Sequence, residues 1–169
     1  EHPDCESDDL LAYYALNKKK NEEVIIYTND RDLCQLISEE VSLYLADKKT
    51  LLGIGNYSWY FQHYYQNAGL VKIIEGCSTD NIKGIEGVTE TTLITHFPEI
   101  KERKVSLEEI IEKSKLLKEE KNLKVFESII EGKTKGNHKG NVYEINKIII
   151  DLNQPLLTDE AKEEVMNLI

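Results

Sequence analysis

Residues 23 to 37 read EVIIYTNDRDLCQLI. Within this stretch an apolar run gives way to two acids and then to a second apolar segment, and this order predicts how the chain folds. The run EVIIYT is β-branched and aromatic, which is typical of a buried strand, and Asp30 and Asp32 follow it directly. The next segment, LCQLI, predicts a helix. In α/β proteins, sites form where strands end. We therefore expect a functional site at this turn.

Helices and strands are expected to alternate on both sides of this stretch. Residues 5–20 place apolar side chains at helical spacing, with acids in the first turn and three lysines at the end, an order that suits the helix dipole. Residues 33–45 predict a helix followed by a strand, and residues 47–54 predict a polar turn followed by another short strand. This order favours a parallel sheet with flanking helices.

The second half of the chain is expected to be mainly helical. The aromatic-rich residues 57–76 predict a helix packed against the sheet, and the glycine-rich residues 76–97 predict a helix, a tight turn and a helix. A charged helix is expected over residues 106–120, and residues 132–141 predict a loop because they are rich in Gly and Asn. A last helix is expected to begin at Thr158, with acids in its first turn.

Length and composition limit the classes of function. The chain has 169 residues, 40% hydrophobic and 31% charged, with no apolar run long enough to span a bilayer, so we expect one soluble, cytoplasmic domain with at most a small annex. Its three cysteines form no close pair, which argues against a disulfide framework or a zinc site. The net charge of -10 argues against indiscriminate nucleic-acid binding. Residues 113 to 139, however, hold eight lysines against four glutamates, so a phosphate backbone could lie there.

Acidic residues gather at the ends of three predicted elements: Glu6, Asp8 and Asp9 at a helix start, Asp30 and Asp32 at a strand end, and Asp80 at the glycine-rich hairpin. Each group alone has an ordinary structural explanation, since acids favour helix N-termini and Asn-Asp pairs favour turns. If the groups converge, their carboxylates repel one another, and hard divalent cations relieve that repulsion. Ligation by oxygen alone favours Mg²⁺ or Mn²⁺ over zinc. Two such ions about 3.5 to 4 Å apart could activate a water and stabilise the leaving oxygen in phosphodiester cleavage.

Three motifs in order resemble the 5′-nuclease family, which includes flap endonucleases, the 5′-to-3′ exonuclease domain of bacterial DNA polymerases and phage RNase H. They are CESDDLLA, IIYTNDRDLCQLI and GCSTDNIKGIEGVTETT, and the match spans about residues 3 to 97. The ending, NKIIIDLNQPLL and a final helix, looks most like phage RNase H proteins. The resemblance implies an α/β fold. A partial PIN-like parallel sheet with flanking helices, the C-terminal part of the nuclease core, is expected over residues 1–75. A helix-three-turn-helix DNA-binding region with C-terminal helices is expected over 76–169.

The resemblance also implies roles for individual residues. Glu6, Asp8 and Asp9 fall where the family binds its first metal ion, and Asp30, Asp32 and Asp80 fall where it binds the second. In the helix-three-turn-helix, backbone amides and a bound monovalent cation, K⁺, grip the phosphates of duplex DNA, and glycines allow that close approach. The expected nucleic-acid contacts are Asn81, Lys83, Gly84, Gly87, Thr89, Lys133, Lys135 and Lys139.

The sequence departs from the family pattern at two positions and in its extent. Cys77 stands where the pattern has an Asp, and a thiol is a poor Mg²⁺ ligand. Thr89 stands where a second turn glycine is usual. The family's N-terminal half, with its first strand, further Asp ligands and a basic arch, has no counterpart before Glu1. We therefore expect the chain to be the C-terminal part of such a nuclease, produced by truncation, proteolysis or a split gene, with the other half as a partner needed for full activity.

Two hypotheses for the function follow. The first is a divalent-metal-dependent 5′-3′ exonuclease or flap endonuclease that hydrolyses phosphodiesters of branched DNA or RNA·DNA in primer removal, in a bacterial or phage-infected cell. The alternative is a catalytically incomplete module that binds DNA or docks a replication partner without cutting. A phosphatase that uses Asp30 as nucleophile and Asp32 as acid is disfavoured, because the usual downstream Lys and second acidic motif are missing.

Overall fold

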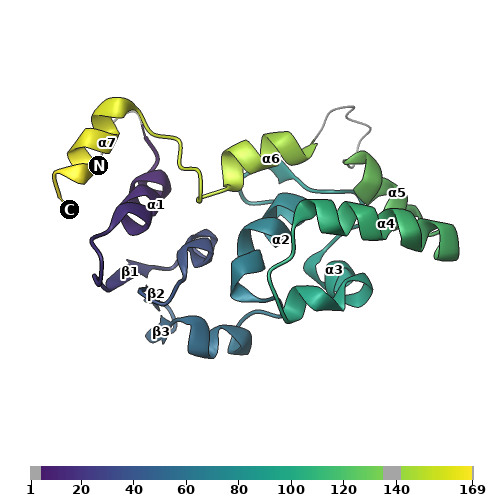
Figure 1. Cartoon of the computed structure of the whole chain (residues 1–169), viewed down its shortest axis with the longest axis horizontal. Helices are drawn as coiled ribbons and strands as arrows, with labels where there is room; N and C mark the ends of the chain where they lie inside the picture. The colour runs from purple at the N-terminus through teal and green to yellow at the C-terminus, as the bar shows by residue number, and fades with distance from the viewer. Residues whose placement is uncertain (1–4, 135–141, 169) are drawn as a thin grey trace. The chain divides into compact units, whose positions relative to one another are not determined.

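The computed structural model describes residues 5–134 and 142–168 (Figure 1). The chain divides into two compact units, one made of Glu1–Tyr60 with Leu152–Ile169 and the other of Phe61–Asp151. Within the described ranges, no helix has both the length and the apolar character needed to cross a membrane. The expected boundary between residues 75 and 76 divides a nuclease core from a DNA-binding region by function, and it stays a prediction.

The first unit holds a sheet of three strands in the order β1 (Val24–Thr28), β2 (Val41–Leu45) and β3 (Thr50–Leu52). β1 and β2 run parallel, with Ile26 opposite Leu43, as the alternation of elements predicts. β3 runs antiparallel to β2, which differs from the expected parallel sheet. The reason is that only residues 46–49 connect these two strands, and a parallel return needs a crossover of a dozen or more residues.

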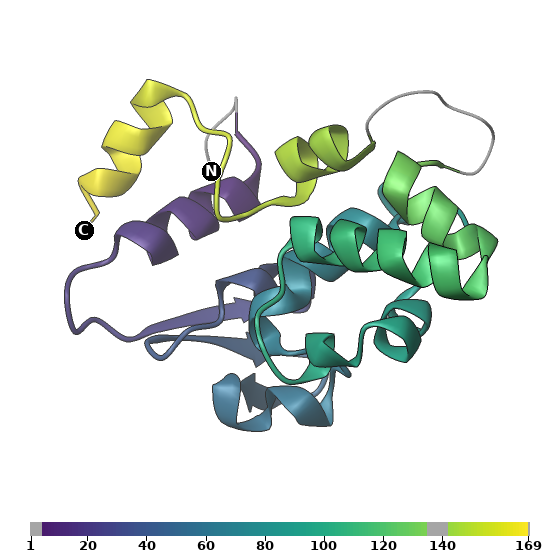
Figure 2. The ribbon, with the colours of Figure 1, turned by 45° about the vertical axis from the view of Figure 1, so that its right-hand side comes forward.

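Two α-helices and two 3₁₀ helices complete the described part of the first unit: α1 (Ser7–Asn17), η1 (Asp32–Leu36), η2 (Ile54–Trp59) and α7 (Asp159–Met166). α1 lies over one face of the sheet and packs against η1 and α7 (Figure 2). The helix expected after β1 is the short 3₁₀ helix η1, because only residues 29–40 connect β1 to the parallel strand β2 and leave little room for a longer helix. The side chains buried in this unit include Ala12, Ala15, Ile26, Leu33, Leu36, Leu43, Leu45 and Leu52.

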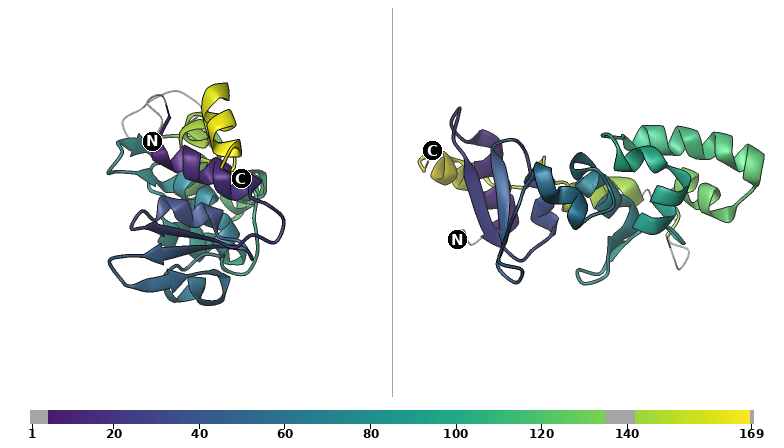
Figure 3. Two further views of the ribbon diagram at one scale, coloured as in Figure 1. Left: turned by 90° about the vertical axis from the view of Figure 1, so that its left-hand side faces the viewer. Right: turned by 90° about the horizontal axis from the view of Figure 1, so that it is seen from below.

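The second unit is mainly helical, as expected. It contains η3 (Tyr65–Asn67), α2 (Ala68–Glu75), α3 (Glu90–His96), η4 (Pro98–Lys101), α4 (Leu107–Lys121), α5 (Lys124–Glu131) and α6 (Val142–Ile150). α4 and α5 pack side by side, and Figure 3 shows the pair from below. These helices enclose one apolar core, whose fully buried members include Ile74, Leu93, Phe97, Ile100, Ile110, Phe126 and Ile129.

The single helix expected over residues 57–76 is wrong in its first half. Regular helix begins only at Ala68, after the two short 3₁₀ helices η2 and η3. The cause is Asn67, a buried residue whose Nδ2 donates to the carbonyls of Ile100 (2.8 Å) and Arg103 (2.7 Å) and whose Oδ1 accepts from the Val105 amide (2.9 Å). Because tertiary hydrogen bonds hold this stretch, helical periodicity in the sequence does not decide its conformation.

The helix, turn and helix expected over residues 76–97 are displaced along the chain. The first helix is α2, which ends at Glu75, and residues 76–83 form a small antiparallel hairpin of β4 (Gly76–Cys77) and β5 (Ile82–Lys83). α3 is the second helix. Gly76 has φ of +77°, a conformation that ends a helix and that L-residues rarely adopt.

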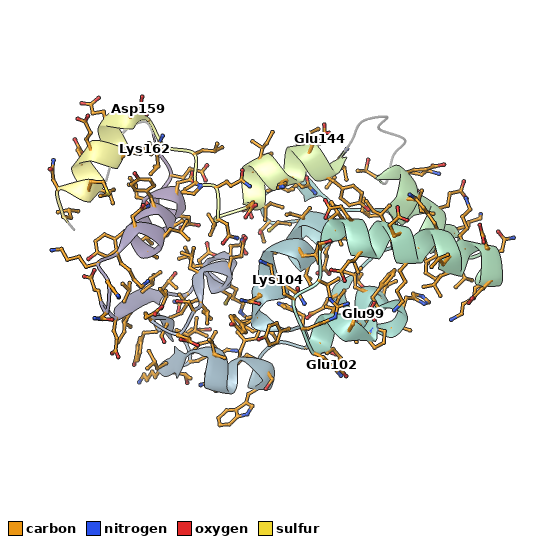
Figure 4. All side chains as sticks on the ribbon, viewed as in Figure 1. Glu99, Glu102, Lys104, Glu144, Asp159 and Lys162 are labelled. Carbon is orange, nitrogen blue, oxygen red and sulfur yellow. The ribbon has the colours of Figure 1, made fainter. Side chains whose placement is uncertain are left out.

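The starts of α4 and α7 are those that the sequence predicts. α4 begins with a capping box in which Ser106 Oγ accepts from the Glu109 amide at 3.2 Å. α7 begins with Thr158, whose Oγ1 accepts from the Ala161 amide at 3.2 Å. On α7, Asp159 and Lys162 lie one turn apart and form an exposed ion pair at 3.3 Å (Figure 4).

Candidate metal centre and nucleic-acid surface

The acids after β1 are held by a network of hydrogen bonds within their turn. The Asp30 amide donates to Thr28 Oγ1 (2.9 Å), and the Asp32 amide donates to Asp30 Oδ1 (2.8 Å). The Asp47 amide, in the turn after β2, donates to Asn29 Oδ1 (2.8 Å). These hydrogen bonds connect the ends of β1 and β2. They also order the backbone that carries the Asp30 and Asp32 carboxylates before any metal ion binds.

The other acids of the first unit lie at the start of α1. Glu6 is the residue before the helix, and Asp8 and Asp9 belong to its first turn. Asp8 is half-buried, and this burial, followed by the negative charges of Asp30, Asp32, Glu6 and Asp9, raises the pKa of its carboxyl group. The structure therefore brings the acids at the start of α1 together with the acids at the end of β1.

Asp9 also has a partner at the other end of the sequence. The amide of Leu156, in the segment between α6 and α7, donates to Asp9 Oδ1 at 3.0 Å. Nearby, Cys5 Sγ and Thr158 Oγ1 are 4.0 Å apart. The start of α1 is thus in contact with the C-terminal part of the same unit.

This donor set suits a hard divalent cation. Its members offer carboxylate oxygens, which are the ligands that Mg²⁺ and Mn²⁺ prefer. The charges that raise the pKa of Asp8 are all carboxylates, so a cation bound among them would relieve an existing repulsion.

Asp80 lies in the second unit, where it stands beside Cys77. Cys77 Sγ donates to Asp80 Oδ2 at 2.7 Å and lies 3.0 Å from Thr79 Oγ1, and Lys72 Nζ donates to Cys77 Sγ at 3.8 Å. The thiol at this position therefore adjoins a carboxylate within the β4–β5 hairpin. A meeting of Asp80 with the acids of the first unit stays a prediction.

The hairpin and the turn that follows it contain the expected nucleic-acid contacts from Asn81 to Thr89. Asn81 and Gly87 have positive φ angles, of 57° and 76°. Gly84 packs so closely against α2 that a Cβ there would lie 1.8 Å from the Glu75 carbonyl oxygen. Lys83 is exposed, and Thr89 caps α3 by accepting from the Thr92 amide at 3.3 Å.

The beginning of the lysine-rich loop pairs with this turn. The Glu86 amide donates to the Lys133 carbonyl at 2.8 Å, and Ile85 and Thr134 form an antiparallel bridge. The exposed Lys133 therefore lies beside the turn from Gly84 to Gly87 within the second unit. Lys135 and Lys139 lie outside the described residues.

Part of the basic stretch is neutralised within the second unit. Lys113 Nζ pairs with Glu99 at 2.7 Å, Lys115 with Glu112 at 2.6 Å and Lys118 with Glu127 at 4.0 Å. Glu99, on η4, is labelled in Figure 4. The lysines of α4 are therefore less available to a phosphate backbone than their number suggests.

A residue that sequence reasoning missed holds the hairpin in place. Asn146, buried on α6, donates from Nδ2 to the carbonyls of Ile73 and Lys83, both at 2.9 Å. It thereby joins the end of α2 to β5. The signal available in the sequence was a single amide within the apolar run YEINKIII.

Comparison with protein families finds a match for the N-terminal third of the chain. The family model described as "5'-3' exonuclease, N-terminal resolvase-like domain" matches residues 1–62. The 5′-3′ exonuclease of Bacillus subtilis is 34% identical over 95 residues, which cover 52% of this chain and 31% of that protein. The 5′-3′ exonuclease of Mycoplasmopsis pulmonis is 33% identical over 107 residues, which cover 61% of this chain and 36% of that protein.

Solved structures share the fold over nearly the whole chain. The T5 5′-exonuclease has a TM-score of 0.70 at 19% identity, covering 97% of this chain and 66% of that one. The bacteriophage T5 D15 flap endonuclease, in a complex with DNA and metal ions, has a TM-score of 0.73 at 19% identity, covering 97% of this chain and 60% of that one.

The chain spans about a third of the length of the two curated exonucleases. The matches include the motifs at the start of α1 and at the end of β1, and the fold of the solved relatives is the α/β fold seen here. By these findings residues 1–62 match the N-terminal resolvase-like domain of 5′-3′ exonucleases, and the chain is similar in fold to the T5 5′-exonuclease.

Proposed function

We propose that this chain is the carboxylate-bearing part of a divalent-metal-dependent 5′-3′ exonuclease or flap endonuclease, which hydrolyses phosphodiesters of branched DNA or RNA·DNA in primer removal. The observation that carries the proposal is the convergence of acids from α1 and from the end of β1 around Asp8. The names of the relatives, 5′-3′ exonuclease and flap endonuclease, support it.

Mg²⁺ or Mn²⁺ is the proposed cofactor, as two ions. Glu6 and Asp8 with Asp30 and Asp32 would hold them, with Asp80 as a further ligand of the second ion. When bound, the ions supply Lewis-acid activation of water and neutralise charge on the phosphate. Similar solved structures, the T5 5′-exonuclease with bound divalent metal ions (zinc) and the T5 D15 flap endonuclease with DNA and metal ions, support a divalent cation, and the oxygen donor set favours Mg²⁺ or Mn²⁺.

Duplex DNA is the proposed ligand of the second unit. The turn from Gly84 to Gly87, with Asn81 and Lys83 before it and Thr89 after it, would hold DNA phosphates together with a K⁺ ion. Lys133 lies beside this turn and adds positive charge. Lys135 and Lys139 are proposed to extend that charge along the same loop.

The remaining half of the nuclease core is the proposed protein partner. Two features of the first unit support it. β1 is an edge strand among the described residues, and its outer face exposes Ile25 (61%) and Tyr27 (74%). Parallel sheets are usually covered on both faces, so an uncovered apolar face beside an unpaired strand edge suits a segment that supplies a strand and a helix.

A flap-cleavage assay tests the proposal. The chain is combined with the part of a relative that it does not match, and cleavage of a 5′-flap substrate is followed with Mg²⁺. The double variant Asp30→Ala plus Asp32→Ala should abolish cleavage, while the control Glu163→Ala plus Glu164→Ala, which removes two exposed acids of α7, should leave it unchanged. If the Asp30 and Asp32 double variant cleaves the flap as well as the unaltered chain does, the proposal is wrong.

The alternative proposed function is a module that binds DNA or docks a replication partner without cutting. The observation that favours it is Cys77 beside Asp80, because a thiol replaces an expected oxygen ligand. It predicts duplex binding with no metal-dependent cleavage in the complemented assay. Replacement of Cys77 by Asp separates the two functions, since restored cleavage would identify the thiol as the defect.

A further inference from the structure

We propose that Asp9 is a positioning residue, through which the C-terminal segment 152–166 holds the first turn of α1 in the geometry that binds metal. The inference rests on the proposed function, because it assigns a part of that same site. It separates Asp9 from the acids that contact an ion directly.

The first observation is the hydrogen bond between the Leu156 amide and Asp9 Oδ1, at 3.0 Å. It joins residues 147 positions apart. A backbone amide that donates to a carboxylate makes a charge-assisted bond, roughly twice as strong as a neutral one. One oxygen of Asp9 is therefore already committed to the C-terminal segment.

The second observation is that this bond belongs to a larger contact. α7 packs against α1, and both helices bury small side chains: Ala12 (0% exposed) and Ala15 on α1, and Ala161 (0% exposed) on α7. Small buried residues let two helices approach closely. Contacts at Cys5 and Asp9 and along the helix thus attach the C-terminal segment to α1 on both sides of Asp8.

The third observation is that the start of α1 lacks a local support. Glu6 occupies the N-cap position and makes no capping hydrogen bond with its side chain, although an N-cap residue usually satisfies an amide of the first turn. An uncapped first turn frays unless something outside the helix holds it, and the Leu156 amide is placed to do so because it donates to Asp9 in that turn.

Four single variants of the full chain test the proposal, with Asp8→Asn as the reference for loss of a direct ligand. Asp9→Ala removes the acceptor, and Leu156→Pro removes the donor while leaving every carboxylate in place. Their matched controls keep the bond: Asp9→Asn retains an acceptor oxygen, and Leu156→Ala retains the amide while removing an exposed side chain. Mn²⁺ affinity is measured by electron paramagnetic resonance, and amide hydrogen exchange of α1 is measured in metal-free protein.

Asp9→Ala and Leu156→Pro should each weaken Mn²⁺ binding about tenfold, and the two controls by less than about threefold, as expected for a residue that orients ligands. The combination of Asp9→Ala with Leu156→Pro should be no worse than Asp9→Ala alone, because both remove one interaction. Exchange in the first turn of α1 should rise in the same two variants. Each variant is checked for an unchanged far-ultraviolet dichroism spectrum.

Different results would contradict the positioning role of Asp9 and the proposed function. If Leu156→Pro changes neither Mn²⁺ affinity nor exchange, the positioning role is overturned. If Asp9→Asn weakens binding as much as Asp8→Asn does, Asp9 is a direct ligand, and the proposal is again overturned. If the unaltered chain does not bind Mn²⁺, the proposed function fails, whereas exchange in Leu156→Pro still reports on the contact itself.

Discussion

Asp8 is the residue on which the candidate site converges. Its burial, and then the carboxylates of Asp30, Asp32, Glu6 and Asp9, raise its pKa in the folded protein. A carboxyl group whose pKa is raised on folding contributes stability that is fully present below the unfolded pKa and is lost as the pH rises through the folded pKa. At neutral pH the ionised Asp8 therefore opposes folding in the absence of metal.

Asp8→Asn should consequently raise the melting temperature of the metal-free protein at pH 7, by about 2 °C. The gain should shrink as the pH falls towards about 4, where the unfolded carboxyl group is protonated. Added Mg²⁺ should reverse the order, because ligand binding stabilises only the protein that retains the site. Thermal denaturation in EDTA and in Mg²⁺ measures both effects.

Glu39→Gln is the control, since it removes an exposed acid from the same unit. A metal-free Asp8→Asn variant less stable than the unaltered chain would show that Asp8 is held by favourable contacts and is not under repulsion.

The places of these acids, at a helix start and at a strand end, could be predicted because each follows a recognisable local pattern, and their role as metal ligands stays a prediction. The bond between Leu156 and Asp9 could not be predicted, because a backbone amide carries no residue-specific signal and the partners lie 147 positions apart. Asn146 was missed for a related reason. Its two bonds, to Ile73 and Lys83, depend on how α6 packs and not on its neighbours in the chain.

At the scale of elements, the β4–β5 hairpin shows how close backbone approach determines a turn. Gly76 and Gly84 face each other across it: a Cβ on Gly76 would lie 2.4 Å from the Gly84 nitrogen. The hairpin is therefore built on positions where only a hydrogen fits. This packing sets where the turn from Gly84 to Gly87 begins.

Gly84→Ala should destabilise the protein by about 2 to 4 kcal/mol, because the new methyl group meets the Glu75 backbone and not a flexible side chain. Gly55→Ala is the matched control, since nothing lies within 4 Å of its added Cβ, and its effect should be small. Urea unfolding followed by circular dichroism gives both values. Equal stability of the two variants would contradict the tight packing of the hairpin.

Local signals predicted all five of these elements: α1 has helical apolar spacing with acids in its first turn, β1 and β2 have β-branched residues, and α4 and α7 have capping residues. The same reasoning failed for residues 57–76, where the aromatic spacing resembles a helix but Asn67 bonds to the loop around Ile100. It also failed for β3, whose direction follows from the length of one turn. Tertiary contacts and chain length overrode local preference in these places.

At the scale of the whole molecule, the balance of charge opposes DNA binding except at selected places. The net charge is -10, and several lysines of α4 are paired with glutamates. Lys133 is exposed beside the turn of the second unit. DNA affinity should therefore depend on a few lysines and not on the lysine content of the chain.

Lys133→Glu plus Lys135→Glu should weaken duplex binding. The slope of log affinity against log salt concentration should also become shallower by about two, because each lost phosphate contact contributes about one. Lys101→Glu plus Lys104→Glu makes the same change of charge at exposed positions of the second unit and should leave the slope unchanged. Fluorescence anisotropy over a salt series measures both slopes. Equal slopes for the two double variants would show that the lysine-rich loop is not the surface that binds DNA.

The α/β class could be predicted because three ordered motifs carry the family resemblance. The division of the chain into units could not, because Leu152–Ile169 belongs with the N-terminal residues. Only folded contacts, such as the packing of α7 on α1, reveal that return of the chain.

Isothermal titration of the full chain with Mn²⁺ tests most directly whether the acids of α1 and β1 form one metal centre. We predict that the unaltered chain binds Mn²⁺ and that Asp30→Asn plus Asp32→Asn weakens the affinity at least about tenfold, although both residues lie outside α1. The same affinity and the same number of bound ions in the double variant would contradict it.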